Sequence, residues 1–147
     1  MADQEMTLFD TDYGVWLEHQ ITALRLEDWS SLDIPHLLEE LEVLNKSNKR
    51  ELYSYLVVLL AHLIKWQYQP LMRSGSWDAS IGNSHNRIER LFKDQPSLKV
   101  YLPEILSEAF EEAKEWAHKE TKLDIKLFPQ VCPYTVEQLL DSGFLPD

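Results

Sequence analysis

The most apolar stretch of the chain, residues 54–70, has the periodicity of a buried helix. Apolar side chains recur every three or four positions, at 56, 59, 60, 63 and 66, which is the spacing of one helix face and not of a strand. Pro70 ends the pattern, because proline lacks a backbone donor and restricts the residue before it. The stretch therefore predicts the central helix of an all-helical protein.

A second apolar stripe lies upstream of this helix, at 37, 38, 41 and 44. Asp33-Ile34-Pro35 precedes it and has the order of an N-cap followed by a first-turn proline. Asn45-Lys46-Ser47-Asn48 weakens the helix, and Asn48 with Glu51 could form a capping box that opens a new one. One interpretation of residues 33–69 is therefore two helices. The other is one long kinked helix, because the stripe at 34, 38, 41, 45, 48, 52 and 56 barely loses phase.

Three further helices are predicted from caps and stripes. Asp10 or Asp12 opens a helix that ends near 26, with its apolar face at 13, 16, 17, 21 and 24. Ser76 caps a helix over 77–94, and Pro103 stands in the first turn of a long helix with a stripe over 102–117. After residue 127 we expect an extended segment that docks on the bundle and ends in a short helix, 136–141, capped by Thr135. The fold class is therefore all-α: a compact bundle of five to six helices (8–126) with a docked tail (127–147), in a single domain (1–147).

Charge is distributed unevenly along the chain. Residues 1–45 carry a net charge of −10, residues 46–99 carry +5, and residues 100–147 carry −6. The basic middle third either pairs with the acidic flanks inside the fold or forms a surface for an anion, and the first interpretation is favoured. The single cysteine, Cys132, excludes an internal disulfide and a four-cysteine zinc site. The first residues do not have the pattern of a secretion signal, and no apolar run reaches the length of a membrane span. We expect a cytoplasmic protein that does not bind a membrane.

Few residues point to chemistry. Glu115 and His118 have the Glu-x-x-His spacing of di-iron bundles, but a second copy of the motif is missing. His62 lies within the apolar helix, where a satisfied core histidine is the favoured interpretation. Nucleophile elbows, phosphate loops and zinc-binding pairs are all missing. The sequence therefore predicts no catalytic residue, no metal site and no cofactor.

The best local candidate for a ligand site lies between residues 65 and 93, where aromatic, amide and cationic side chains alternate. This combination suits an anionic or stacked ligand. The favoured interpretation is purely structural. The tryptophans are core anchors, with Trp66 largely buried, and Arg87 and Arg90 pair with acidic residues of 33–42 or 104–115. The candidate ligand-binding residues are Lys65, Trp66, Gln69, Arg73, Trp77, Arg87 and Arg90.

The same region carries a family resemblance. The string Leu60-Ala-His-Leu-Ile-Lys-Trp-Gln-Tyr-Gln-Pro70, with Arg73-Ser74 and Ser76-Trp77 after it, resembles the core of the bacterial family known as domain of unknown function 29. The opening (Tyr13, Trp16, 32–33 and 39–42) and the close (128–129, 132–135 and 144–146) are similar to that family as well. Asn45 stands where the family would have glycine, which favours a continuous helix. The resemblance implies a helical fold in bacterial cytoplasm and carries no activity, substrate or site residue.

Three functions of different kinds remain. The leading hypothesis is a non-enzymatic protein-interaction module that binds an unknown protein partner, or a second copy of itself, through its acidic faces. The alternative is binding or processing of an anion or nucleic acid through residues 65–93, which is not favoured. A metal-dependent hydrolase that uses His62 or His118 is the least supported of the three.

Overall fold

The computed structural model describes residues 6–147, and every ordered element in that range is helical. The six α-helices are α1 (Leu8–Thr11), α2 (Tyr13–Arg25), α3 (Ile34–Tyr68), α4 (Gly75–Asp94), α5 (Leu102–Thr121) and α6 (Val136–Leu140). Short 3₁₀ turns connect them: η1 (Trp29–Ser31), η2 (Pro70–Met72), η3 (Pro96–Tyr101) and η4 (Ile125–Leu127). The prediction of an all-α fold is confirmed, and the residues described contain no strand.

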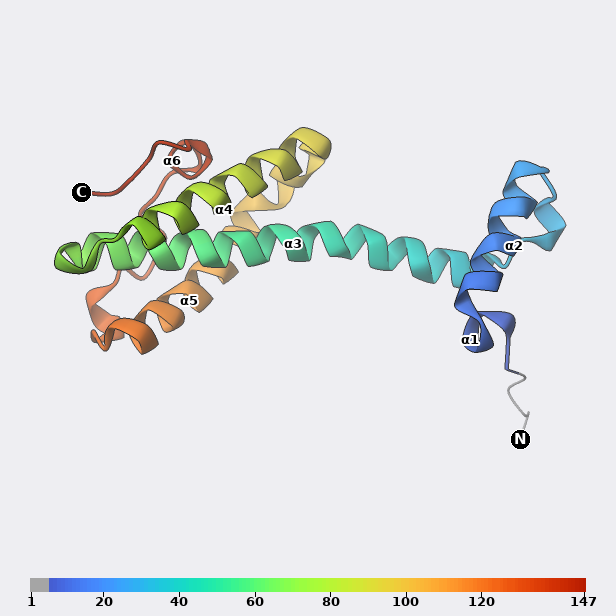
Figure 1. Cartoon of the computed structure of the whole chain (residues 1–147), viewed down its shortest axis with the longest axis horizontal. Coiled ribbons are helices and arrows are strands. Elements are labelled where there is room, and N and C mark those ends of the chain that lie inside the picture. Colours follow the sequence, from blue (N-terminus) through green and yellow to red (C-terminus); the bar gives the residue numbers. More distant parts are fainter. Residues whose placement is uncertain (1–5) are drawn as a thin grey trace. The chain divides into compact units, whose positions relative to one another are not determined.

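The central helix α3 is continuous over 35 residues, and Figure 1 shows it without a break. Asp33 starts it as predicted: its backbone oxygen accepts from Leu37 N at 2.9 Å, and its carboxylate accepts from His36 N at 3.4 Å. The two-helix interpretation of 33–69 is therefore wrong and the single-helix one is right. Asn45 and Asn48 are weak helix formers, but their cost of a few tenths of a kcal/mol each does not end a helix.

The contacts divide the chain into two compact units, Met1–Asn45 and Lys46–Asp147, with the boundary inside α3. The first unit contains α1, α2, η1 and the start of α3, and the second contains the rest. Whether the whole chain unfolds as the single domain expected from its length stays a prediction.

The second unit holds the main hydrophobic core. Leu52, Leu56, Leu59, Leu60 and Leu63 on α3 are each at most 1% exposed. Helices α4 and α5 run beside this part of α3 (Figure 1) and bury their own apolar faces against it. The core residues from the other elements are Ile81, Ile88, Phe92, Leu98, Leu102, Ala109, Phe110, Ala113 and Ala117.

The C-terminal tail packs on this core as predicted. Phe128, Tyr134 and Leu139 belong to the core, and Leu140 and Phe144 are partly buried against it. Thr135 caps α6 by accepting from Gln138 N at 3.1 Å, while the Gln138 side chain accepts from Thr135 N at 2.9 Å. This reciprocal capping box explains how so short a helix is defined.

The first unit departs from its predicted packing. Asp12 caps α2, accepting from Val15 N at 3.1 Å, but the buried face of α2 consists of Trp16, Gln20 and Ala23. Of the predicted apolar face only Trp16 is buried, and Tyr13, Leu17, Ile21 and Leu24 are between 38% and 47% exposed. A stripe read from sequence shows which side chains share a face, but it does not show that anything covers that face.

One helix start in the second unit also differs from expectation. Ser74, not Ser76, is the N-cap of α4, and its hydroxyl accepts from Trp77 N at 3.2 Å. The helix therefore begins at Gly75, two residues before the predicted start, and it continues through Gly82-Asn83-Ser84. In α5, Pro103 stands in the first turn as predicted, and Lys122, at φ 64°, ends the helix in a left-handed conformation.

Candidate functional site

Lys65 lies at the centre of the predicted site, and it is buried. Its residue is 3% exposed. The ammonium Nζ lies 2.5 Å from Glu120 Oε2 on α5, and the Glu120 side chain is 49% exposed. Trp116 Nε1 donates to the other carboxylate oxygen at 2.6 Å. The hydrogen bond from Lys65, followed by that from Trp116, holds the pKa of Glu120 below its usual value. Lys65 therefore has its counter-ion within the fold.

Two indole rings flank the same ammonium. Nζ of Lys65 lies 5.3 Å from the centre of the Trp77 ring and 5.7 Å from that of Trp116. Cations placed over indole faces at such distances are stabilised by the ring quadrupole, more strongly where water is excluded. The structure thus brings together Lys65 and Trp77 of the predicted set and adds Trp116 and Glu120, which the sequence analysis did not select. The only sequence signal for the addition was the acid and indole spaced by four residues on one helix.

Trp66 and Arg73 form a second pair beside the first. Arg73 Nε donates to the backbone oxygen of Trp66 at 2.8 Å, and its guanidinium carbon lies 5.0 Å from the ring centre. Trp66 is half-buried and packs at the edge of the core. The side chain packs against the core as expected, although it is less deeply buried than Leu59 and Leu63. Its place in the stripe is taken up by Lys65, which lies deeper.

The remaining residues of the 65–70 string hold the tail. Tyr134 Oη donates to Gln67 Oε1 at 2.8 Å, and the Tyr68 and Phe128 rings meet edge to face with centres 5.2 Å apart. Gln69 closes α3: its N–H donates to Lys65 O at 2.9 Å, and its own oxygen accepts from Met72 N at 3.0 Å. The string Lys65–Pro70 therefore fastens α5, the connection to α4 and the tail to one helix end.

Arg87 and Arg90 lie elsewhere on the second unit. They line a cavity of about 340 Å³ together with Asn48, Glu51, Leu91, Asp94 and Gln95. Asn48 Nδ2 donates to Gln95 Oε1 at 2.6 Å across it. Within residues 6–147, no ion pair of 4.0 Å or less includes either arginine. The prediction that they pair with acids of 33–42 or 104–115 is wrong, and both guanidinium groups face solvent.

The histidines singled out in the sequence make structural contacts. His118 Nδ1 lies 2.5 Å from Leu123 O just beyond α5, and His62 Nδ1 lies 2.8 Å from Val58 O one turn earlier on α3. Burial lowers the pKa of His62, so the neutral ring is favoured. In the part of the chain described, no group of three or more His, Cys, Asp or Glu residues is placed to hold a metal ion.

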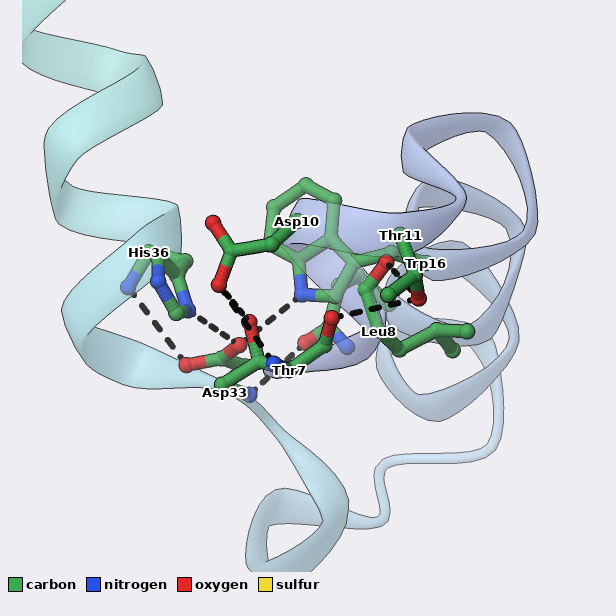
Figure 2. Close-up of polar contacts among 8 residues, drawn as sticks. Thr7, Leu8, Asp10, Thr11, Trp16, Asp33 and His36 are labelled. Carbon is green, nitrogen blue, oxygen red and sulfur yellow. Dashed lines mark hydrogen bonds and ion pairs between the residues drawn. The ribbon is translucent and has the colours of Figure 1, made fainter. Parts of the chain in front are cut away.

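A separate polar cluster fixes the first unit. Asp33 Oδ2 accepts from Trp16 Nε1 at 2.9 Å and lies 2.6 Å from His36 Nδ1, and Gln20 Oε1 accepts from Asp33 N at 2.7 Å. Figure 2 shows Trp16 and His36 converging on Asp33 from two helices. Burial opposes the charge of Asp33, but the hydrogen bonds from His36 and Trp16 outweigh it and lower its pKa. The cluster sets the angle between α2 and the start of α3.

The first unit leaves most of its apolar side chains uncovered. Among residues 6–147, twenty-two large apolar side chains are exposed, and fourteen of them lie in residues 6–45. In α2 only Trp16, Gln20 and Ala23 are buried. On α3 the uncovered side chains are Ile34, Leu38, Leu41, Val43 and Leu44, each between 56% and 62% exposed. The part of this unit that is described also carries nine acids against one base, Arg25.

These observations can be set beside known proteins. The family model described as "Domain of unknown function DUF29" matches residues 8–145. The chain belongs to this family. The resemblance drawn from residues 60–77 and the two ends is thereby confirmed across almost the whole chain. None of the curated proteins and none of the solved structures compared with the chain matches it.

Across residues 6–147, none of the helices combines the length and apolar character that crossing a bilayer demands. Although α3 is long enough, charged residues are spread over its first half.

Proposed function

We propose that this member of the DUF29 family is a protein-interaction module that acts without catalysis, through the first unit. The observation that carries the proposal is the concentration of exposed apolar side chains there, amid a net negative charge. Monomeric proteins rarely expose contiguous apolar surface of this kind unless it is used for binding. The acids around it keep the surface soluble and select against other acidic proteins.

The second unit contributes fewer of the exposed apolar side chains. The string Lys65–Pro70 is engaged with α5 and the tail, and Lys65 already has Glu120 as its counter-ion. Binding of a partner through an exposed apolar face does not require a reaction. Cytoplasmic location remains part of the proposal, and cell fractionation checks it.

The test compares two variants of the full chain in capture from host lysate. Leu38→Asn/Leu41→Asn removes two exposed leucines from one face of α3. Val43→Asn is the matched control, because Val43 is 58% exposed on the opposite face of the same helix. We expect the native chain and the control to retain a bound protein, identified by mass spectrometry, that the double variant loses. Equal retention by all three would overturn the proposal.

Anion or nucleic-acid binding is the second candidate, and one observation favours it. Arg87 and Arg90 are exposed, unpaired within residues 6–147 and gathered at a cavity. Of the seven candidate ligand-binding residues, these two arginines are left for an anion. The other five, Lys65, Trp66, Gln69, Arg73 and Trp77, already make contacts within the fold. Glu51 and Asp94 at the same cavity oppose an anion.

Filter binding of single-stranded nucleic acid at low salt tests this candidate. Binding that weakens steeply with added salt and is lost in Arg87→Gln/Arg90→Gln would support it. Lys119→Gln/Lys126→Gln is the control, since it removes the same charge elsewhere. If both pairs of substitutions change binding alike, the retention reflects overall charge and the candidate fails.

A further inference from the structure

His85 on α4 is a buried polar side chain without a hydrogen bond. The residue is 2% exposed, and neither ring nitrogen has a partner among residues 6–147. Buried polar groups in folded proteins are nearly always paired, because an unpaired one has lost its bonds to water and gained none in return. The ring is therefore an unfavourable component of the core, and it is also a group that can take up a proton.

The ring lies where α4 meets α6. The two helices contact each other, and two groups at the end of α6 act on the ring: the backbone of Leu139 and the carboxylate of Asp141. The backbone of Leu139 approaches the ring without the geometry of a hydrogen bond. Leu139 itself is 1% exposed. Movement of α6 away from α4 would therefore give the ring access to water.

Helix α6 is weakly held at this interface. It has five residues, and helices of that length are not stable in water without tertiary contacts. Within residues 6–147, no ion pair of 4.0 Å or less joins α6 to α4. A cavity of about 290 Å³, lined by side chains from α4, η3 and α6, lies beside the contact. These features favour local opening of α6 at a lower free energy than unfolding of the whole core.

Few charges are placed to compensate a proton on His85. Asp141 is the one ionisable group of the described chain that acts on the ring, and it is exposed, so water screens its effect. Arg87, Glu89 and Glu137, which follow on α4 or precede on α6, are exposed and do not act on it, and neither does any ionisable group of α3 or η3. Burial therefore dominates and lowers the pKa of His85.

We propose that His85 is an acid-sensitive switch at the α4–α6 interface, and that its protonation releases α6 (Val136–Leu140) while the core of the second unit stays folded. The released ring is hydrated and binds a proton more readily than the buried one, so a falling pH favours the released state. The ordinary pKa of histidine is about 6.5, so the effect begins as the pH falls below that value. The proposal does not depend on the apolar surface of the first unit.

Amide hydrogen exchange of the full chain tests the switch. Protection factors are compared, because they remove the intrinsic effect of pH on exchange. The reporters are the amides of Gln138, Leu139 and Asp141, which are hydrogen-bonded in or next to α6. They should be less protected than residues 52–64 at both pH 7.5 and pH 5.5. Their protection should decrease by up to about tenfold between these values, the limit for uptake of one proton.

Two variants assign the proton to His85. Residues 127–147 contain no histidine, so no imidazole of the tail itself titrates in this interval. His85→Leu and His85→Gln do not titrate, and each should make the protection of the three amides equal at the two pH values. His19→Gln, at an exposed position of α2, should keep the decrease seen in the native chain.

Three results would overturn the proposal. The first is a change of less than about twofold in the native chain between pH 7.5 and pH 5.5. The second is protection of the three amides equal to that of residues 52–64, because α6 would then open only when the whole unit unfolds. The third is a pH dependence that persists in both His85 variants, because another group would then bind the proton.

Discussion

Lys65 and Glu120 form an ion pair whose two members differ in burial: the Lys65 side chain is 4% exposed and the Glu120 side chain is 49% exposed. Removing the exposed partner leaves a charge in the interior, whereas removing the buried partner leaves a carboxylate that water can reach. We expect Glu120→Gln to destabilise the second unit by about 3 kcal/mol, the lower end of the cost of orphaning a buried charge. Lys65→Met should cost less than half of that. Urea unfolding measures both.

The double variant Lys65→Met/Glu120→Gln provides the control for this pair. Because the orphaned charge is gone, it should be more stable than Glu120→Gln alone. Equal cost for the two single variants would contradict the interpretation that burial of Lys65 decides the energetics.

Gly82 gives the simplest stabilising substitution. It lies inside α4, and a Cβ built on it meets nothing within 4 Å. Gly82→Ala should therefore raise the free energy of unfolding by about 0.5–1 kcal/mol, since alanine loses less backbone entropy in a helix. A thermal melt shows this as an increase in Tm of a few degrees. A decrease in Tm would contradict the expectation that a methyl group at position 82 fits without a clash.

His62 and His85 make the stability of the second unit depend on pH. Burial lowers the pKa of both rings, and neither nitrogen of His85 has a hydrogen-bond partner within residues 6–147. A lowered histidine pKa means that the unfolded chain binds protons more readily, so stability is full above about pH 6.5 and falls as the pH drops below it. We expect the urea midpoint to decrease from pH 7.5 to 5.5.

His85→Leu should keep its stability at pH 7.5, because an apolar group replaces an unsatisfied polar one, and should flatten this dependence. His19→Gln, at an exposed position of α2, is the control for changing a histidine as such. A pH dependence that His85→Leu does not alter would assign the effect to His62 alone.

At the scale of elements, the sequence predicted which segments are helical better than it predicted what they pack against. Proline and Asp caps placed the starts of α3 and α5, and the stripe that begins at 34 kept a continuous α3 open as an alternative to two helices despite the weak formers Asn45 and Asn48. The error at Ser74 arose because Ser74 and Ser76 are equivalent as caps until the preceding turn is known. The apolar stripes of the first unit were predicted, but their exposure was not, because a stripe carries no information on what covers it.

The site was harder to predict because its contacts join distant segments. The sequence selected Lys65 and Trp77, which do meet, but not Glu120 or Trp116, which lie more than fifty positions from Lys65. It also grouped Arg87 and Arg90 with Lys65, although these arginines line a cavity near Asn48 that does not include Lys65. Residues close in sequence along α4 were taken to be close in space. A helix of 20 residues is about 30 Å long, so residues near its two ends do not share a site.

The docked tail is the element whose removal should matter most. Phe128, Tyr134 and Leu139 contribute to the core, and Tyr134 bonds to Gln67. Truncation after Asp124 should expose their apolar contacts and cause aggregation or a large loss of stability. Leu139→Ala, at 1% exposure, is the milder version and should cost about 2–5 kcal/mol. A soluble truncated chain with an unchanged melting temperature would show instead that the tail is dispensable for folding.

At the scale of the molecule, the two units should differ in local stability. The first has few buried residues, while the second has a contiguous core over three long helices and the tail. Amide hydrogen exchange should therefore be fast over 8–32 and slow over 52–64 and 109–117 at a concentration where the chain is monomeric. If the chain is the single domain expected from its length, calorimetry should still show one transition. If the amides of residues 8–32 exchanged as slowly as those of 52–64 and 109–117, the two units would not differ in local stability, and the expectation would be wrong.

The fastening of three segments to residues 65–70 has a consequence for synthesis. Lys65 bonds to a residue 55 positions later, and Gln67 to one 67 positions later. Contacts this distant cannot form until both partners have left the ribosome, and they slow folding because the intervening chain must first be ordered. During translation α3 therefore emerges with its leucine-rich face bare. The last turn of α3 cannot make its contact with Tyr134 earlier, so the second unit completes its fold only after residues 120–134 have left the ribosome.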